Sequence, residues 1–405
     1  MKLLGLRSDA DPYPAYARLR EDAPVNRLSL RAGLPCSLVC GYGAARAALT
    51  DPRLSRDPRM AVPQWREADR GRGLEDSSDL GVHLLTREPP DHTRLRGLIS
   101  AAFAASRVEC LRGRVQEITD SLIDAIQARG TAELIADFAY PLAITVICDV
   151  LGIAPEDRIH FRQWTSNAVA AGPGRAGGRP ASSPVPGSYL RTLVAARRRC
   201  PGDDLLSTLI AAGERNRLSQ TELLSMVFLL LLAGHEGTVG LIGNGIAALT
   251  ANPGQLALLR DRPGLLDSAV AEILRYDGPM ELAAWRFATE PVALGGTTIP
   301  AGEPVLIALA GAHRDPGRFT EPDRLDISRT DNPHLGFGSG THYCAGATLA
   351  RMEGTIALET LFRRLPDLAL ATPADRLRRQ PSFVIRGLHE LPVTYTPVRA
   401  RRRPS

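Results

Sequence analysis

The sequence lacks the features that would place it in several broad classes of protein. Its six cysteines show neither a disulfide-dense pattern nor the paired spacing of a zinc site. The longest apolar run, residues 226–234, is well short of a membrane span. Residues 1–10 are too short for a secretory signal. We therefore expect a cytoplasmic protein with reduced cysteines and no membrane anchor.

Lysine is almost absent from the chain. Lys2 is the only lysine, so 48 of the 49 basic residues are arginine, and the formal net charge is +5. Most of these arginines lie beside Asp or Glu along expected helices, which is typical of solvated helix faces. The denser basic run in residues 399–405 is expected to be a disordered tail. No nucleic-acid-binding motif accompanies the positive charge, so we expect no nucleic-acid partner.

The chain has no compositional break, so residues 1–405 are expected to form one large domain. A capping box at Ser219–Glu222 predicts the start of a long apolar helix that runs to about Thr250. Residues 280–309 alternate between apolar runs and glycine turns, which predicts β structure. The expected fold class is therefore mainly α with a small β-rich portion.

The remaining segments predict shorter elements. We expect a short helix after Asp11, a hairpin over 25–39, and helices over 107–129, 134–151, 155–171 and 265–276. Residues 51–78 have little periodicity and predict a long loop. A Gly/Pro/Ser-rich interruption at 171–187 predicts a flexible loop between helices.

The most informative stretch runs from His334 to Arg351, where one cysteine lies between closely spaced glycines and a helical pattern. The glycines favour backbone bends and the close approach of another group. The apolar stripe after Gly346 predicts a helix, which places Cys344 just ahead of a helix N-terminus. Unpaired amides and the helix dipole lower the pKa of a cysteine there. We therefore expect a thiolate that a flat ligand can approach.

This stretch resembles the haem-binding loop of the cytochrome P450 family, whose pattern is F-x-x-G-x-[RH]-x-C-x-G. The matching positions are Phe337, Gly340, His342, Cys344 and Gly346. The resemblance implies that Cys344 ligates the iron of haem b and that His342 binds a haem propionate. Phe337, Gly338 and Gly346 would surround the cofactor. The haem would lie between the long central helix and the helix that follows the cysteine loop.

Two further segments resemble the propionate-binding positions of the family. A helix that starts near Glu88 carries His92 and Arg96 one turn apart on the same face, in the family's pattern H-T-x-x-R. Arg286 precedes the predicted hairpin, where the family places a third propionate contact. The resemblance implies that His92, Arg96 and Arg286 bind the propionates.

The middle of the long helix resembles the family's oxygen-activation motif, A-G-x-[DE]-T. Ala233, Gly234 and Glu236 match it. Gly237 occupies the position of the usual threonine, and Thr238 follows one residue later. The resemblance implies that Glu236 supplies protons through water, and it makes Gly237 and Thr238 the other catalytic candidates. Because Thr238 points about 100° further round the helix, we expect water or a substrate hydroxyl to fill the gap at Gly237.

Other positions resemble structural and substrate-contacting parts of the family. Glu272 and Arg275 match its E-x-x-R pair, which is internal and structural, and Arg329 is the expected third member. Taken alone, such an i,i+3 pair would be interpreted as a surface salt bridge. The candidate substrate contacts are Ala233, Gly234, Met280, Leu282, Ala283 and Phe383.

The resemblance implies a haem-thiolate monooxygenase of the bacterial, actinomycete type. It would use dioxygen to hydroxylate or epoxidise a small hydrophobic natural product in secondary metabolism, such as a macrolide, another polyketide, a terpene or a peptide. The chain has no flavin or iron–sulfur segment, so a ferredoxin and a ferredoxin reductase are the expected electron donors. A monomer is expected.

Three alternatives stay open at this point. The same centre could couple substrates or close rings without inserting oxygen. Some related proteins are non-catalytic partners of glycosyltransferases, but these typically lack the thiolate ligand, which Cys344 would supply. A peroxide-driven enzyme is disfavoured, because such members tend to carry an arginine where Glu236 stands.

Overall fold

The computed structural model describes residues 11–30, 33–67, 80–155, 161, 186–215, 217–382 and 384–398. The expected helix over 155–171, the loop over 171–187, the basic tail and Phe383 lie largely or wholly outside these residues. The α-helices are α1 Tyr13–Asp22, α2 Tyr42–Thr50, α3 Pro63–Glu67, α4 Asp91–Ser100, α5 Ala105–Cys110, α6 Arg112–Ile126, α7 Tyr140–Leu151, α9 Pro186–Arg199, α10 Leu205–Glu214, α11 Gln220–Ala251, α12 Pro253–Asp261, α13 Leu266–Tyr276, α14 Leu309–His313 and α15 Ala347–Arg364.

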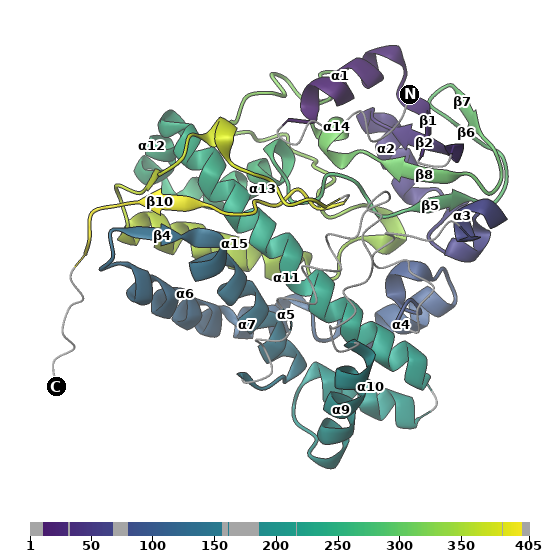
Figure 1. Ribbon diagram of the computed structural model, residues 1–405, viewed down its shortest axis with the longest axis horizontal. Helices are drawn as coiled ribbons and strands as arrows, with labels where there is room; N and C mark the ends of the chain where they lie inside the picture. Colours follow the sequence, from purple (N-terminus) through teal and green to yellow (C-terminus); the bar gives the residue numbers. More distant parts are fainter. Residues whose placement is uncertain are drawn as a thin grey trace.

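The strands form three small antiparallel or mixed sheets, while helices make up most of the fold (Figure 1). The strands are β1 Val25–Ser29, β2 Pro35–Val39, β3 Leu54–Ser55, β4 Thr131–Glu133, β5 Arg286–Ala288, β6 Val292–Leu294, β7 Thr297–Ile299, β8 Pro304–Ile307, β9 Ala369–Leu370 and β10 Pro392–Thr394. The largest sheet has the order β1-β2-β8-β5-β3, in which only β2 and β8 run parallel. The expected fold class, mainly α with a small β-rich portion, is confirmed.

Helix α11 begins where the capping box predicts. The hydroxyl of Ser219 accepts a hydrogen bond from the Glu222 amide, and the Ser219 amide donates to the Glu222 carboxylate at 2.7 Å. These two bonds satisfy amides that the first helical turn leaves unpaired. The helix is followed directly by α12, because Asn252 breaks the helical geometry and Pro253 starts the next helix.

Helix α11 runs through the middle of the molecule, between the five-stranded sheet and the α6, α7 and α15 layer (Figure 1). Among the described residues it is the one helix long and apolar enough to cross a membrane, but 78% of its apolar window is buried inside the fold. It supplies residues to the two largest core clusters. The apolar composition of α11 is therefore explained by its place in the core.

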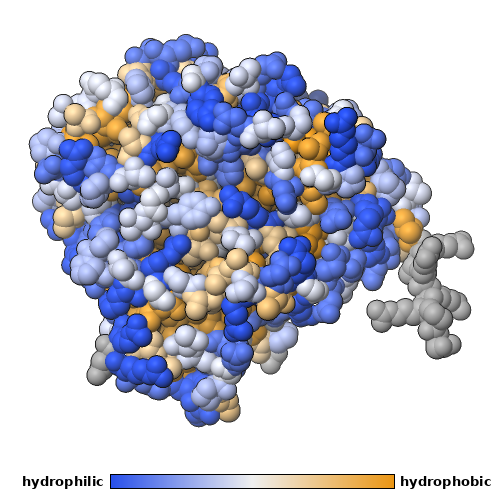
Figure 2. Space-filling model, turned by 180° about the vertical axis from the view of Figure 1, so that it is seen from behind, coloured by the Kyte–Doolittle hydropathy of each residue, from blue (hydrophilic) through white to orange (hydrophobic). Residues whose placement is uncertain are grey.

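The outer surface differs from this interior. On the face seen in Figure 2, hydrophilic side chains predominate, and apolar residues show as separate stretches between them. The many arginines take part in surface ion pairs, such as Arg112 with Glu109 and Arg318 with Asp331. Exposed pairs of this kind contribute little to stability, so the apolar core is the main source of stability.

Two expectations about local structure are wrong. The expected loop over 51–78 contains β3, a 3-10 turn at Pro58–Met60 and the short helix α3 in its described part. Trp65 explains this order, since its ring is 4% exposed and packs edge-to-face on Trp285 and Phe287. The segment 107–129 forms two helices, α5 and α6, that meet at Leu111 instead of one.

Candidate haem site

The loop that carries Cys344 is held in a fixed shape by backbone bonds. The Cys344 amide donates to the Phe337 carbonyl at 2.9 Å, which closes the turn between them. Gly338 and Gly340 have φ values of +74° and +72°, a region that favours glycine. Helix α15 starts three residues after the cysteine. The loop therefore presents the Cys344 side chain, which is exposed, at the entrance to α15.

The expected thiolate at Cys344 does not follow from the helix dipole. Burial among protein atoms raises the pKa of the Cys344 thiol above its ordinary value, although part of its side chain is accessible. The Gly346 amide and the charges of Arg96 and Arg351 lower it, but they do not outweigh the loss of solvation. A bound metal ion deprotonates a coordinating thiol outright. A thiolate here therefore depends on coordination to iron.

Two predicted propionate ligands lie beside one another near this loop. The rings of His92 and His342 meet edge-to-face with centroids 4.5 Å apart, and the His92 side chain is buried. Nε2 of His342 lies 3.2 Å from a carboxylate oxygen of Glu88, whose other oxygen accepts a bond from the Arg56 amide at 2.6 Å. Despite its partial burial, these contacts lower the pKa of Glu88. The carboxylate therefore holds the His342 ring in place.

The two predicted arginines flank the same region. Arg96 donates to the carbonyl of Tyr343 at 2.8 Å, next to the cysteine. Arg286 is 4% exposed, and it donates to the carbonyls of Leu54 and Leu49 at 2.9 and 3.1 Å. Burial, reinforced by the neighbouring charge of Arg56, lowers the pKa of Arg286 to about 9. An anion bound nearby would relieve this electrostatic cost.

The polar atoms of this cluster fit a dianionic group such as haem. Among the described residues, Nε2 of His92, Nδ1 of His342 and Nε of Arg286 are buried without a hydrogen-bond partner. Buried polar atoms without partners are costly, so three on neighbouring residues indicate an absent ligand. Propionates would provide acceptors for these nitrogens, and Cys344 offers sulfur to iron. The residues present therefore fit haem b.

The middle of α11 has one accessible face in an otherwise buried helix. Ala233 is exposed and Gly237 is partly exposed, and a Cβ added to Gly237 would meet no atom within 4 Å. The two residues are one helical turn apart, so they share a face. Glu236 and Thr238 are 7% and 4% exposed. Thr238 is therefore on the packed side of the helix, as its rotation from Gly237 predicts.

Gly234 has a different role from Gly237. A Cβ at Gly234 would lie 2.5 Å from Ile147 of α7, a distance that real Cβ contacts essentially never show. The glycine at this position therefore allows α7 and α11 to approach one another. Helix packing therefore requires a glycine at position 234, which is itself partly exposed, whereas open space for a side chain lies at Gly237.

The E-x-x-R pair is fully buried. Arg275 donates two hydrogen bonds to Glu272, at 2.8 and 2.7 Å, and neither side chain is exposed. The arginine also donates to three main-chain carbonyls, of His313, Pro322 and Arg324. Arg329 lies 3.3 Å from Glu272. The pair is therefore not the surface salt bridge that its spacing alone suggests, because distant backbone groups supply its remaining partners.

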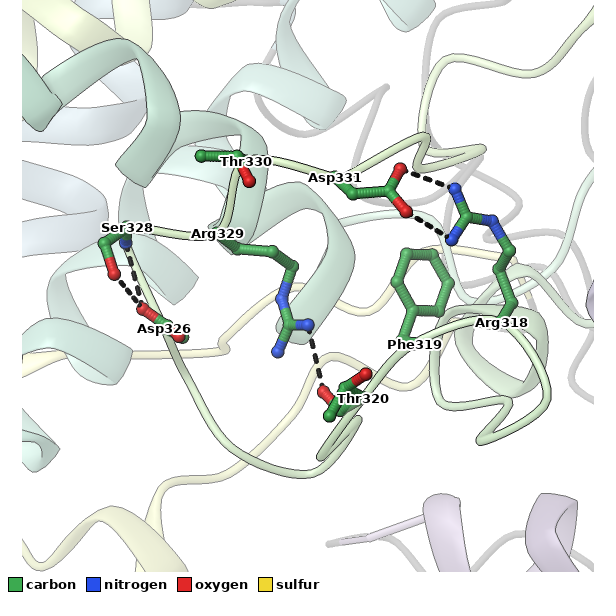
Figure 3. A pocket seen from close by; sticks show the side chains of 8 residues that line it. All are labelled: Arg318, Phe319, Thr320, Asp326, Ser328, Arg329, Thr330 and Asp331. Carbon is green, nitrogen blue, oxygen red and sulfur yellow. Dashed lines mark hydrogen bonds and ion pairs between the residues drawn. The ribbon is translucent and has the colours of Figure 1, made fainter.

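Arg329 extends this network into the segment that precedes the cysteine loop. Its guanidinium donates to the Thr320 carbonyl at 2.9 Å, and Arg318 pairs with Asp331 beside it (Figure 3). A pocket of about 300 Å³ lies here, and its mostly polar lining includes Arg318 and Asp331, which pair with one another. Its lining holds none of the candidate haem residues. We interpret this pocket as a surface feature of the segment before the cysteine loop and not as the haem site.

The candidate substrate contacts fall into two groups. Leu282 is 2% exposed and belongs to the core cluster under the five-stranded sheet. Met280 and Ala283 keep accessible surface and pack at the edge of a neighbouring cluster. Core packing thus explains Leu282, whereas Met280 and Ala283 keep surface that a ligand can reach.

Sequence reasoning missed two residues that position the site. Glu88 contacts and orients His342. Glu88 lies four residues before His92, so its position beside the predicted propionate ligands could have been inferred from the sequence. His313 is 1% exposed, and its Nε2 accepts the Leu335 amide at 2.8 Å, just before the cysteine loop. The sequence does not reveal this contact of His313, because its partner is 22 residues away.

The free energy of unfolding is expected to decrease as the pH falls below about 6.5. Burial lowers the pKa of His313 well below its ordinary value, and burial with the charge of Arg351 lowers that of His334 to about 4. The unfolded chain binds protons at these rings from about pH 6.5 downward, but the native chain does not. Urea unfolding should show a loss of roughly 1–3 kcal/mol between pH 6.5 and pH 4. H313Q should flatten this dependence; an unchanged slope would contradict the assignment to His313.

A cysteine at a helix entrance, a cationic cluster beside it and an accessible face of the central helix define the site of a haem-thiolate protein. The family model described as "Cytochrome P450" matches residues 259–366. The chain is 47% identical over 396 residues to "Cytochrome P450 monooxygenase PikC" of Streptomyces venezuelae, covering 97% of this chain and 93% of the relative. The chain belongs to the cytochrome P450 family.

Further comparisons agree over nearly the whole length. "6-deoxyerythronolide B hydroxylase" of Saccharopolyspora erythraea is 42% identical over 403 residues, covering 96% of this chain and 98% of the relative. The structure "tirandamycin C-bound P450 monooxygenase TamI" superimposes with a TM-score of 0.89 at 40% identity, covering 98% of this chain and all of that chain. The chain is therefore a haem b monooxygenase of the secondary-metabolism type, which uses a small substrate and redox partners.

Proposed function

We propose that the chain inserts one oxygen atom into a hydrophobic polyketide or macrolide-type substrate at the accessible face of α11. The observation that carries this proposal is the pairing of Ala233 and Gly237, which leave one face of a buried helix open. Two relatives support the substrate class: the 6-deoxyerythronolide B hydroxylase named above, and "Polyketide biosynthesis cytochrome P450 PksS" of Bacillus subtilis, which is 37% identical over 388 residues. When bound through Cys344, haem supplies the dioxygen activation.

The residues of the chain would divide the remaining work. His92, Arg96, Arg286 and His342 would bind the propionates and so orient the macrocycle. Ala233, Met280 and Ala283 would contact the substrate, since each keeps accessible surface. Glu236 would hold and deliver the protons that dioxygen reduction consumes, from a buried position one residue before the gap at Gly237.

The experiment that tests the substrate class is a binding screen followed by product mass. Purified holoenzyme is titrated with macrolactones and linear polyketides, and the change of haem spin state is recorded. We expect a spin-state shift with macrolactones and a product heavier by one oxygen atom. A shift with other classes only, or an oxygen-free product, would contradict the proposal.

A second candidate function is oxidative bond formation without oxygen insertion. One superimposable structure is "cytochrome P450 enzyme CxnD for C-S bond formation in chuangxinmycin biosynthesis", with a TM-score of 0.89 at 37% identity. In this case the product would weigh two hydrogen atoms less than the substrate. A non-catalytic role beside a glycosyltransferase is disfavoured, because the cysteine is retained in a fully formed loop.

Adding a hydroxyl at Gly237 is expected to improve coupling. Gly237→Thr meets open space, so the variant should fold like the wild type, and its hydroxyl could hold the proton-carrying water. We expect product per electron pair to rise about twofold, whereas G237A should give no gain. G234T is the matched control: it should lower stability, because its side chain would overlap Ile147. If G237T instead lowers both substrate affinity and product yield, the result indicates that a substrate hydroxyl occupies the space at Gly237 in the wild type.

We further propose a small acidic ferredoxin, with its reductase, as the electron donor. Arg96 and Arg351 lie close enough to Cys344 to affect its pKa, so at least two cationic side chains lie near the cysteine. We expect reduction by the ferredoxin to slow several-fold when the salt concentration rises from about 50 to about 500 mM, because salt screens the attraction between surface charges. Stopped-flow reduction measures this rate, and a rate that does not depend on salt would contradict electrostatic docking.

We also propose that the chain works in the cytoplasm as a monomer and that residues 1–405 form a single domain. The burial of α11 supports the cytoplasmic location, because α11 is the one helix among the described residues that is long and apolar enough to cross a membrane. The central position of α11, which packs on α7, α13 and α15, supports one core instead of two independent units. Sedimentation of the holoenzyme and a single unfolding transition would test the last two statements.

A further inference from the structure

The oxygen-activation motif contains a histidine that the roles above do not use. His235 lies between Gly234 and Glu236 in the middle of α11 and is 0% exposed. Its ring meets Tyr140 of α7 edge-to-face, with centroids 5.5 Å apart. Burying an imidazole in a core costs free energy unless its nitrogens are bonded. The contacts of the two ring nitrogens therefore indicate what the residue does.

The first nitrogen fixes the tautomer of the ring. Nδ1 of His235 lies 2.6 Å from the carbonyl oxygen of Leu231, one turn earlier in the helix. A carbonyl oxygen can only accept a hydrogen bond, so Nδ1 must carry the hydrogen. This bond also fixes the direction of Nε2.

The second nitrogen faces the catalytic acid. Nε2 of His235 lies 3.3 Å from Oε1 of Glu236, which is itself 7% exposed. With Nδ1 protonated, a neutral ring presents a lone pair at Nε2, and an ionised carboxylate presents only acceptors. The contact is favourable when one proton lies between them, on the imidazole or on the carboxyl.

We propose that His235 and Glu236 form a proton-holding pair beside Gly237. Glu236 is the catalytic residue, and His235 is a positioning residue that orients the carboxyl and keeps one proton on the pair. When Glu236 gives up this proton toward water at the accessible face, a carboxylate remains beside a neutral imidazole. A proton from solvent restores the pair. This inference rests on the role of Glu236 proposed above, and it adds His235 as the residue that keeps a proton available to Glu236.

The test is a double-mutant cycle that needs no identified substrate. The wild type, H235Q, E236Q and the double variant reduce dioxygen with NADPH and a surrogate ferredoxin and reductase, and dioxygen consumption is measured in water and in deuterated water. The side-chain amide that H235Q introduces keeps hydrogen-bonding groups but cannot carry a titrating proton. We expect each single variant to be about tenfold slower, and the double variant to be no slower than E236Q. Independent effects that multiply to about a hundredfold would overturn the pair.

A second readout separates positioning from general damage to the fold. Thermal unfolding of the same four holoenzymes should show midpoints about 2 °C lower for each single variant and a double shift smaller than their sum. S225A is the matched control, because Ser225 is a fully buried hydroxyl on α11 that accepts the Val82 amide at 3.3 Å. S225A should keep the wild-type rate and isotope effect.

The outcomes also distinguish this inference from the function on which it rests. If E236Q consumes dioxygen like the wild type, the proposed role of Glu236 fails. If E236Q is slow but H235Q keeps the wild-type rate and solvent isotope effect, only the pair fails.

Discussion

Cys344→Ser is expected to abolish monooxygenation and to lower the haem content, because an alcohol oxygen would not replace the thiolate that Cys344 would supply to the iron. The loop itself should persist, since its closing bond joins the amide of residue 344 to the Phe337 carbonyl and does not involve the side chain. We therefore expect a folded protein with an unchanged far-ultraviolet circular dichroism spectrum, little bound haem and no detectable product. The pyridine haemochrome assay and product analysis measure the two losses.

Cys110→Ser is the matched control for this change. Cys110 is also an exposed, free cysteine, but it lies at the end of α5. C110S should keep the haem content and the turnover of the wild type, because it removes an exposed thiol without a ligand role. If C344S forms as much product as C110S, Cys344 is not required for the reaction.

Arg275→Met is expected to prevent the chain from reaching its haem-binding fold. The substitution removes the two hydrogen bonds from Arg275 to the fully buried Glu272 and leaves this carboxylate the longer ion pair with Arg329; breaking a buried pair costs about 3–5 kcal/mol. It also removes the donors for three main-chain carbonyls, at about 1–3 kcal/mol each. The sum is comparable to a typical total stability of about 5–15 kcal/mol. Expression should therefore yield insoluble or haem-free protein, measured by the ratio of Soret to protein absorbance.

Two milder variants keep this prediction testable where R275M does not fold. Arg329→Ala removes the third member, whose side chain is 11% exposed, and should lower stability by about 1–3 kcal/mol while haem still binds. Arg324→Lys changes an exposed arginine that pairs with Glu321, and it should be neutral within about 0.5 kcal/mol. Equal losses of stability in R329A and R324K would show that the buried network stabilises the fold no more than an exposed ion pair does.

The features that sequence predicts best are those that depend on near neighbours. The capping box of α11 is made within four residues, and the glycine bends around Cys344 are local to one loop. The E-x-x-R pair shows the limit of such reasoning. Its spacing is local, but its burial depends on carbonyls 38 to 49 residues away, so spacing alone suggests the wrong environment.

Two glycines in the middle of α11 show the same limit at one site. Gly234 and Gly237 are identical in the sequence, yet one is required by the contact with Ile147 and the other faces open space. Only the packing of α7 on α11 separates them. The pKa of Cys344 was predicted wrongly for a related reason, because desolvation by the surrounding chain outweighs the local effect of the helix N-terminus.

The carbon monoxide difference spectrum of the reduced holoenzyme shows whether sulfur ligates the iron. We expect the red-shifted Soret band that is characteristic of thiolate-ligated haem, and we expect C344S but not C110S to lose this band. A band at the position of imidazole-ligated haem, or a thiolate band that persists in C344S, would contradict this expectation.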